Sequence, residues 1–551
     1  MLEQEAKPSV GIKLLACRNE TESLQVVATA KAKQLADLTF HFEAAVSDSG
    51  SLVPAPILYW QYDIPVTKSS PRAPLKTGLY PDALIPFQNT SKPNIRAFRG
   101  LNGRVNFRLW VDLKIPQNQT PGIYHGKCIL KKSGEVISEI SYTIQIVAET
   151  LPKRPALKSY FGLNEHRIAE LSGLDRVDDG IALSRVMDDY YQLMMDCRVG
   201  PGLVYATSAP IMENGDLLWS SPASPTLPAA KDITQRYFKE GKFRCLHLPM
   251  WRDYPFQDPL GKDRLKAVAY LAELAKLFKQ AAPEADLIFS VGSLDEPDNR
   301  ETYEKIRQWS VLVRSASQIS NEKISFFVTE QPEPQSREWG TLTGAVDIWS
   351  PHVMWAWEDL ESNKGKEIIS KRIDSGDEVW CYPALSQFRD IWKHEKGEPN
   401  TLRDSYPPVW LTDYPGIHYR ILPWICAAKQ FSGIHYWNVF HWPQGTNPWK
   451  DAGSFIGGDE TFNGDGLLIY PPAPTELRGG MTATPCPSIR LKWIRDGMED
   501  YDHLKILQNT HPKRAADILS GIARGFADWE TSPKEVFQAR RAISEAMLNS
   551  P

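Results

Sequence analysis

A chain of 551 residues exceeds the usual size of a single hydrophobic core, so the sequence predicts two or three domains. Its 42% hydrophobic and 24% charged residues are typical of a folded globular protein and exclude a largely disordered chain. The formal net charge of −4 is small for this length and gives no indication of nucleic-acid binding.

The cysteines and the apolar segments argue against a zinc protein, a disulfide-rich protein and a membrane-spanning protein. The 7 cysteines are scattered and no two form a CxxC pair, so the sequence predicts neither a zinc site nor a dense disulfide framework. The N-terminal segment "MLEQEAKPSV" is polar, and no apolar run approaches the length of a membrane span. We therefore expect no membrane span. The compartment stays open between the cytoplasm and a secreted or periplasmic location after removal of a leader.

The first 150 residues have the pattern of an all-β domain. Short runs such as "ESLQVVATA" and "GRVNFRLWVDLKIP" alternate apolar and polar residues and are separated by Gly, Pro, Ser and Asn. Several strands at this spacing predict a β-sandwich over residues 1–150. The proline-rich segment "ETLPKRPALK" that follows is a candidate linker.

Between residues 157 and 510 the pattern changes to strands that alternate with helices. The expected strands are "KSYFGLN", "GLVYA", "FRCLHLPM", "ADLIFSVGS", "KISFFVTE", "AVDIWSPHV", "EVWCYPAL" and "GIHYWNVFH", of which "GLVYA" is the least regular. Amphipathic segments such as "DRLKAVAYLAELAKLFKQAA" lie between them. Eight such units predict a (β/α)8 barrel of the TIM type, so we expect a multidomain protein with a β-sandwich followed by an α/β barrel.

The C-terminal part of the chain has a helical pattern. "PSIRLKWIRDGMEDYDHLKILQ" predicts the eighth helix of the barrel, with Ser488 as its N-cap and an apolar stripe that includes Ile489, Trp493, Leu504 and Leu507. Two further amphipathic segments, "RAADILSGIARGFADW" and "PKEVFQARRAISEAML", predict a helical extension over residues 511–551.

Barrel enzymes carry their active sites at the carboxyl ends of the strands. In this sequence those ends offer many polar and aromatic side chains and few aliphatic ones: Asn164, His166, His247, Trp251, Asp295, Glu296, Thr329, Glu330, His352, Trp355, Trp357, Tyr382, Trp437, Asn438, His441 and Trp442. Flat rings beside polar groups suit the face of a sugar, although any single Trp can equally belong to the core. Because no glycine-rich phosphate loop and no HExxH motif is present, we expect a carbohydrate pocket without cofactor or metal.

Two adjacent acids, Asp295 and Glu296, follow the fourth strand in "DLIFSVGSLDEPDN". Glycosidases usually need two carboxyl groups, and we expect the second one of a common retaining barrel to follow strand seven. Strand seven ends in "VWCYPALSQ" without a carboxylate, which favours substrate-assisted hydrolysis by the sugar's own 2-acetamido oxygen. Glu296 then acts as the acid/base, and Asp295 accepts the acetamide N–H. Tyr382 can donate to the acetamide carbonyl.

Other interpretations of these residues stay open. The sequence "DEP" can be an acidic loop or a cap of the helix that begins near "NRETYEKI". Glu330, at the next strand end, can be the nucleophile of a conventional mechanism together with Glu296. His166 and His247 can be satisfied histidines of the barrel. Asp465 in "NGDG" can be a turn residue or reach the substrate from a loop.

The C-terminal third carries the most specific pattern. "DYPGIHYRILPWICAAKQFSGIHYWNVFHW", "NPW", "NGDGLLIYP" and "PSIRLKWIRDGMEDYDHLKIL", with "SLDEP" upstream, resemble the catalytic domain of glycoside hydrolase family 123. Members of that family are usually described through a C-terminal domain of unknown function. The segment "FRLWVDLKIPQNQTPGIYHGKCIL" resembles the family's β-sandwich. The resemblance implies an exo-acting, retaining β-N-acetylgalactosaminidase that uses substrate-assisted catalysis.

The resemblance also implies roles for individual residues. The family's catalytic pair corresponds to Asp295 and Glu296, and Tyr382 corresponds to the tyrosine that orients the acetamide. Substrate contacts are expected from the remaining strand-end residues Trp437, Asn438, Trp442, His352, Asn164, His247, Glu330 and Trp355. Arg420 is expected to be structural or to contact substrate. The helix residues Arg495, Glu499 and Asp500 are expected to form a structural network.

Several functions fit these observations. The expected partner is a glycan or glycolipid with a terminal β-linked N-acetylgalactosamine. A glycosidase of another sugar specificity on the same scaffold is the first alternative, because one or two unidentified side chains read the axial 4-hydroxyl. A non-catalytic glycan-binding protein is the second alternative, although such a protein has no need of a proton donor. The oligomeric state and the role of the sandwich stay open.

Overall fold

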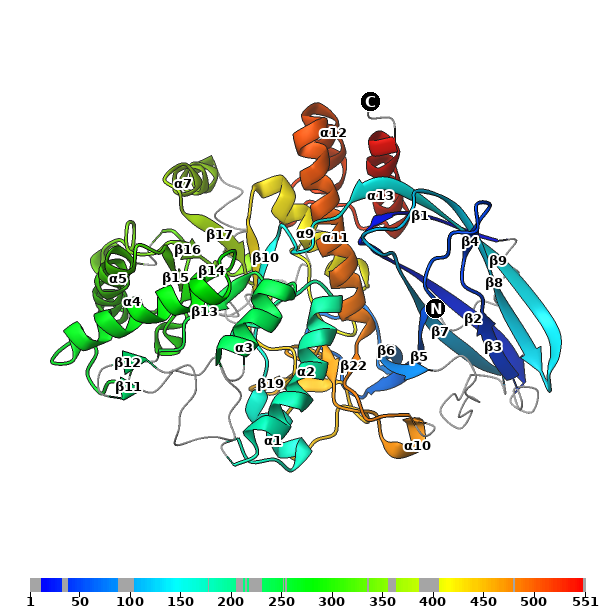
Figure 1. Cartoon of the computed structure of the whole chain (residues 1–551), viewed down its shortest axis with the longest axis horizontal. Coiled ribbons are helices and arrows are strands. Elements are labelled where there is room, and N and C mark those ends of the chain that lie inside the picture. The colour runs from blue at the N-terminus through cyan, green and yellow to red at the C-terminus, as the bar shows by residue number, and fades with distance from the viewer. Residues whose placement is uncertain are drawn as a thin grey trace, which may run out of the picture.

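The computed structural model describes residues 11–31, 38–87, 104–176, 178–204, 212–213, 216–217, 230–250, 252, 255–333, 336–354, 363–385, 406–478 and 481–548. Figure 1 shows the N-terminal sheets on one side of the molecule and the α/β barrel on the other, with the long helix α11 (Ile489–Thr510) between them. None of the helices within these ranges is long and apolar enough to cross a membrane.

The N-terminal region folds into two sheets, as expected for a sandwich. One sheet has the order β1 (Ile12–Arg18), β9 (Glu135–Thr150), β8 (Gly122–Lys132) and β3 (Leu38–Phe42), with β4 (Val46–Ser47) also paired to β8. The other has the order β2 (Thr21–Lys31), β7 (Arg104–Lys114), β5 (Ile57–Val66) and β6 (Gly78–Phe87). Side chains from both sheets meet in the core, where the rings of Phe40 and Phe107 stack 4.5 Å apart.

The second region is a nearly closed barrel of seven parallel strands. Their order is β10 (Lys158–Phe161), β18 (Gly433–Tyr436), β17 (Glu378–Cys381), β16 (Ile348–Trp349), β15 (Ile324–Val328), β14 (Asp286–Phe289) and β13 (Cys245–His247). The larger helices between them are α2 (Gly180–Asp196), α4 (Arg264–Ala281), α5 (Arg300–Ser320), α7 (Asn363–Asp374), α9 (Ile417–Lys429) and α11. Parallel strands linked by helices bring all the strand ends that carry polar residues to one face of the barrel.

The expected eighth strand does not form within the described residues. In place of "GLVYA", the chain makes a single parallel bridge between Phe161 and Pro201, with hydrogen bonds from Phe161 N to Gly200 O and from Gly202 N to Phe161 O. Proline has no N–H to donate, and glycine is a poor strand former, so this segment cannot continue a ladder. The described residues thus form seven strands of a nearly closed barrel, and the eighth strand stays a prediction because residues 205 and 206 of "GLVYA" lie outside them.

Short helices, turns and strands lie in the segments that connect and follow the barrel strands. They are α1 (Glu165–Ser172), β11 (Met212–Glu213), β12 (Asp216–Leu217), α3 (Ala230–Thr234), the π-helical turn η4 (Gln235–Glu240), the 3-10 turns η5 (Gly292–Leu294) and η6 (Arg337–Trp339), β19 (Gly453–Gly457), β20 (Glu460–Asn463), β21 (Ile469–Tyr470), α10 (Thr475–Arg478) and β22 (Cys486–Pro487). The predicted C-terminal helices are present as α12 (Pro512–Ile522) and α13 (Pro533–Leu548).

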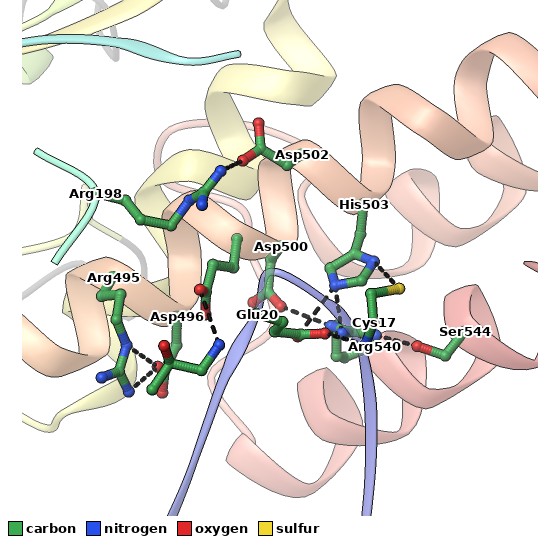
Figure 2. Close-up of polar contacts among 12 residues, drawn as sticks. Cys17, Glu20, Arg198, Arg495, Asp496, Asp500, Asp502, His503, Arg540 and Ser544 are labelled. Carbon is green, nitrogen blue, oxygen red and sulfur yellow. Dashed lines mark hydrogen bonds and ion pairs between the residues drawn. The ribbon is translucent and has the colours of Figure 1, made fainter. Parts of the chain in front are cut away.

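Helix α11 joins the barrel to the sandwich. It begins as predicted, because Ser488 Oγ accepts the N–H of Leu491 at 3.1 Å. Its buried Arg495 lies 3.0 Å from the Asp112 carboxylate of β7, and Asp502 pairs with Arg198 next to the barrel. Figure 2 shows this network continuing toward α13, whose Arg540 contacts Glu20. These buried ion pairs connect α11 to the sandwich, the barrel and α13.

Candidate active site

The two adjacent acids lie on a loop at the carboxyl end of the barrel. Strand β14 ends at Phe289, the turn η5 follows, and Asp295 comes directly after that turn. Helix α5 begins only at Arg300, and Asn299 is its cap, because the Asn299 side chain accepts the N–H of Thr302 at 2.9 Å. The acids therefore lie in the loop between β14 and α5. They do not belong to the strand, and they do not cap the helix.

The backbone at Glu296 has an unusual conformation. Its φ angle is +44°, in the left-handed region that residues with a Cβ rarely adopt. The N–H of Glu296 donates to Thr329 Oγ1 at 2.9 Å, and the Thr329 hydroxyl donates to Asp295 Oδ1. A conformation that costs on the order of 1–3 kcal/mol persists only where neighbouring contacts fix it. The loop thus holds the two carboxylates in one defined arrangement.

A layer of aromatic rings crosses the interior of the barrel beside the acids. The ring of Tyr382, which follows β17, lies 4.8 Å from that of His435 and 5.5 Å from that of His352. Tyr160 of β10 continues the layer, 4.9 Å from His435 and 5.7 Å from His247. The residues come from separate strands, which fixes the rings from several sides. They form a platform on which the apolar face of a pyranose can lie.

Two further layers lie beneath this platform. The first is apolar and fills the barrel with Cys245, Ile288, Phe327, Ile348 and Trp380. The second, at the amino ends of the strands, is ionic: Lys158 Nζ lies 2.6 Å from Glu378 Oε1 and 3.1 Å from Asp286 Oδ2. The barrel is therefore filled at that end, and the candidate site lies at the carboxyl end.

Burial, and to a smaller extent the charges of the two acids, alters several pKa values at this face. Partial burial, with a further contribution from the Asp295 charge, raises the pKa of Glu296 above its ordinary value of 4.5, although the residue is exposed on the loop. Burial and the charges of Glu296 and Asp295 raise the pKa of Tyr382, so its hydroxyl stays a donor. Burial lowers the pKa of His435 to about 3 and that of His247 to about 4, so both imidazoles are neutral near pH 7.

Trp437 is fixed at the edge of the site by a residue from a distant loop. Its Nε1 donates to Asp465 Oδ2 at 3.3 Å, and Tyr436 donates its hydroxyl to Asp465 Oδ1 at 3.0 Å. Gly466 has a φ of +71° and packs so close that a Cβ would lie 2.3 Å from the Trp437 ring. Burial raises the pKa of Asp465 to about 7, against the effect of these donors. Asp465 thus positions the tryptophan from within the core.

Three of the expected substrate contacts have structural partners. Asn164 caps α1, because its Oδ1 accepts the N–H of Arg167 at 3.0 Å. Asn438 Oδ1 accepts the N–H of Phe440 at 2.8 Å. Trp442 is buried, with the Arg167 guanidinium 5.2 Å from its ring centre. These contacts account for the side-chain oxygens of both asparagines and for one face of the indole.

The remaining predicted residues divide between the platform and the surrounding loops. His247 Nε2 lies 2.7 Å from Ser290 Oγ, and His352 Nε2 contacts the carbonyl of Ala384. Glu330 is 3% exposed, and its carboxylate accepts the N–H of Gln331 at 2.7 Å. Trp355 lies outside the described residues, as do Trp251 and Trp357.

His435 and Tyr160 belong to the site although the sequence pattern did not single them out. Both lie inside strands, β10 and β18, whose sequences have the pattern of a buried core. Their neighbours along each strand point away from the barrel interior. Side chains alternate along a strand, so the period of two places Tyr160 in line with Lys158, and His435 in line with Trp437. A count of inward positions in β10 and β18 is the signal that could have found them.

A group that could hold a metal ion lies away from this site. Among the described residues, Cys17, Glu20 and His503 bring their ligand atoms within 4.8 Å of one another at the junction of sandwich and helices. Arg540 contacts both Glu20 and His503 there, as Figure 2 shows, and a guanidinium beside the group opposes a cation. Burial also raises the pKa of the Cys17 thiol, which disfavours the thiolate that binds metal. These residues fit a structural role.

Taken with this geometry, comparisons with known proteins support a carbohydrate-cleaving enzyme. Residues 356–507 match the family model of the glycoside hydrolase 123 catalytic domain, which confirms the resemblance seen in the sequence. The matched range begins at residue 356, after the acid pair, so Asp295 and Glu296 lie outside it. No curated protein matches the sequence significantly.

Solved structures extend the likeness to the whole chain. A family 123 glycoside hydrolase from Clostridium perfringens, studied for the details of glycolipid glycan hydrolysis, superposes with a TM-score of 0.60 at 13% identity, over 98% of this chain and 94% of that one. A putative β-galactosidase from Bacteroides fragilis has a TM-score of 0.29 at 12% identity, over 88% of this chain and 59% of that one. A family 39 glycoside hydrolase from Bacteroides cellulosilyticus has a TM-score of 0.33 at 10% identity, over 88% of this chain and 81% of that one. The first of these shows a shared fold, and the other two are too distant to carry an argument.

Proposed function

We propose that this protein is a retaining exo-glycosidase that removes terminal β-linked N-acetylgalactosamine by substrate-assisted catalysis. The observation that carries the proposal is the pair Asp295 and Glu296 at the carboxyl end of the barrel, where the charges of both acids act on Tyr382. The carboxylate of strand seven, Glu378, is bound to Lys158 at the opposite end of the barrel, so it is no candidate for a second catalytic acid.

The proposed first step divides the work between the two acids. Glu296 gives its proton to the glycosidic oxygen while the acetamide carbonyl oxygen of the substrate attacks C1, which breaks the glycosidic bond and forms a cyclic oxazolinium-type intermediate. Asp295 accepts the acetamide N–H and stabilises the positive charge that develops there. The Thr329 hydroxyl engages Oδ1 of Asp295, which leaves Oδ2 to accept from the substrate.

The second step returns the enzyme to its starting state. Glu296, now ionised, takes a proton from a water molecule whose oxygen attacks C1, and the acetamide is released with its carbonyl restored. Two displacements at C1 give net retention of configuration. Tyr382, kept protonated by its raised pKa, orients the acetamide carbonyl by donating to it. The mechanism uses the chain's own side chains and needs no cofactor.

The substrate class follows from the platform and from the structural neighbour. Tyr382, His435 and Trp437 offer flat rings, and neutral imidazoles suit an uncharged sugar. The Clostridium perfringens enzyme is described with glycolipid glycans, so we infer a glycan or glycolipid substrate for this chain as well.

The experiment is the release of p-nitrophenol from β-GalNAc, β-GlcNAc and β-galactosyl derivatives by the wild type, Asp295→Asn and Glu296→Gln. Activity on β-GalNAc alone that either substitution abolishes supports the proposal. Cleavage of the β-galactosyl compound, which lacks the acetamide, contradicts it and directs attention to Glu330 as a nucleophile. Binding of N-acetylgalactosamine without turnover, unaffected by either substitution, supports a glycan-binding protein instead.

A further inference from the structure

Thr329 contacts both members of the acid pair with a single hydroxyl group. It is 7% exposed and directly follows β15, which pairs with β14, the strand that precedes the acids. Its Oγ1 accepts the N–H of Glu296 at 2.9 Å and donates to Asp295 Oδ1. A hydroxyl has one proton to give. Because the backbone N–H can only donate to it, that proton is directed at Asp295, which receives it best as a carboxylate.

The bond to Glu296 also explains the backbone conformation of the acid. Glutamate has neither the freedom of glycine nor the short polar side chain of asparagine that makes a left-handed φ tolerable. Its φ of +44° therefore needs an external partner for the N–H, and Thr329 is that partner. Without it, we expect the peptide to relax to a negative φ, which turns the Glu296 side chain away from its present direction.

We propose that Thr329 is a positioning residue that fixes Glu296 in its left-handed conformation and orients the Asp295 carboxylate, so that each acid faces its own group of the same bound sugar. The catalytic part of this inference rests on the proposed function. The conformational part stands on the two hydrogen bonds and the φ angle alone. Support for a shared direction of the two acids comes from Tyr382, whose pKa both of them raise.

Three variants test the proposal. Thr329→Val keeps the shape of the side chain but removes the hydroxyl, Thr329→Ser keeps the hydroxyl, and Thr234→Val is a matched control. Thr234 is also buried, and its hydroxyl donates to the Ala230 carbonyl at 2.7 Å within helix α3, so its loss removes one buried hydrogen bond elsewhere. The measurements are kcat and KM on p-nitrophenyl β-GalNAc and crystal structures of both Thr329 variants.

We expect Thr329→Val to lower kcat by about 100-fold, the scale of a misplaced catalytic group, while KM changes by less than about threefold. Thr329→Ser and Thr234→Val stay within about threefold of the wild type in kcat. In the crystal structure of Thr329→Val, Glu296 leaves the positive φ region, whereas Thr329→Ser retains it.

A Thr329→Val enzyme with wild-type kcat, or one in which Glu296 keeps its positive φ, overturns the proposal. So does a serine variant as impaired as the valine variant. If the wild type cleaves none of the aryl glycosides, the proposed function fails, and the crystal structures alone then decide the positioning role. The two failures are therefore distinguishable.

Discussion

The two ends of the barrel each hold a pair of carboxylates, and they treat them in opposite ways. At the amino end, Asp286 and Glu378 share the ammonium group of Lys158. At the carboxyl end, Asp295 and Glu296 form no ion pair with any residue in the described part of the chain. The barrel thus carries a neutralised cluster at its amino end and, at its carboxyl end, two acids that have no ion-pair partner among the described residues.

The pKa values follow from this difference. Burial alone raises the pKa of Glu378, but Lys158 outweighs that effect and brings the pKa below its ordinary value. Burial raises the pKa of Glu296 as well, and there the Asp295 charge adds to the increase. A compensated carboxylate contributes to stability, whereas an acid with a raised pKa is suited to proton transfer near neutral pH. This difference in charge compensation supports the carboxyl end as the place of the proposed chemistry.

The largest expected effect is that of Glu296→Gln. Loss of the general acid lowers kcat/KM on p-nitrophenyl β-GalNAc by about 10³- to 10⁴-fold, with little change in the free energy of unfolding. The matched control is Glu378→Gln at the other end of the barrel, which should lower stability but leave the kcat/KM of the folded enzyme within about threefold. Equal loss of activity in both variants would contradict the assignment of the acid role to Glu296 and of a structural role to Glu378.

Removing the shared cation tests the amino end. Lys158→Met leaves Glu378 without its ammonium partner, while Asp286 keeps the guanidinium of Arg244 at 2.9 Å, and lowers the free energy of unfolding by about 3 kcal/mol near pH 7. Because the pKa values of both acids are lowered in the native state, the stability they contribute is present above their unfolded values and lost as pH falls through the native ones.

Urea unfolding at pH 7 and at pH 3 measures this contribution, and the difference between wild type and variant should shrink at the lower pH. The control is Lys305→Met, which removes a solvent-exposed pair with Glu301 and should change the free energy of unfolding little. A Lys158→Met protein no less stable than this control would show that the amino-end pair is not held by its cation.

Asp465 shares a property with each pair of acids. It is buried in the core, like an acid with a structural role, but it contacts Trp437 at the edge of the candidate site. Its pKa of about 7 in the native state exceeds the ordinary 3.8, so the folded protein binds this proton more tightly than the unfolded chain. Stability from this group is complete below about pH 4 and declines as pH rises to about 7.

Asp465→Asn cannot ionise and lacks this decline. The free energy of unfolding of the wild type minus that of the variant should therefore be greater at pH 4.5 than at pH 8, by about 2–4 kcal/mol. Urea titrations at the two pH values, followed by Trp fluorescence, provide the comparison. An identical difference at both values would mean that Asp465 is ionised throughout the range.

The smallest effect concerns the pH profile of the wild type. Glu296 must be protonated to act as an acid, and its raised pKa keeps it so above the ordinary value of 4.5. The alkaline limb of kcat/KM should therefore have its midpoint above pH 4.5, which a series of initial rates from pH 3.5 to pH 9 measures. A midpoint at or below 4.5 would remove the electrostatic distinction between the two ends.

Local patterns were sufficient for much of the fold. Alternating strands predicted the sandwich sheets, and the Ser488 cap with its apolar stripe predicted α11. The eighth strand was predicted from an apolar run, but the bridge at Pro201 is all that this segment forms before the described residues end. The domain boundaries at residues 150, 157 and 510 stay predictions, since the sheets and helices of the two regions share one core.

The site was less predictable because it depends on contacts between distant segments. The acid pair and Tyr382 stand out by residue type at strand ends, whereas the bond from Glu296 to Thr329 spans 33 positions of sequence. The left-handed φ of Glu296 could not be predicted locally, because glycine or asparagine, and not glutamate, are the residues that indicate this conformation. The roles assigned to these residues remain proposals that the experiments above address.

The central claim, that Asp295 and Glu296 divide a substrate-assisted reaction, has a direct test in the acetamide itself. Aryl β-GalNAc derivatives with acetyl, fluoroacetyl, difluoroacetyl and trifluoroacetyl groups make the carbonyl oxygen progressively less nucleophilic. Substrate-assisted catalysis predicts that kcat/KM falls steeply across this series, by about tenfold or more per fluorine. A flat series would contradict it, because a carboxylate of the enzyme would then be the nucleophile.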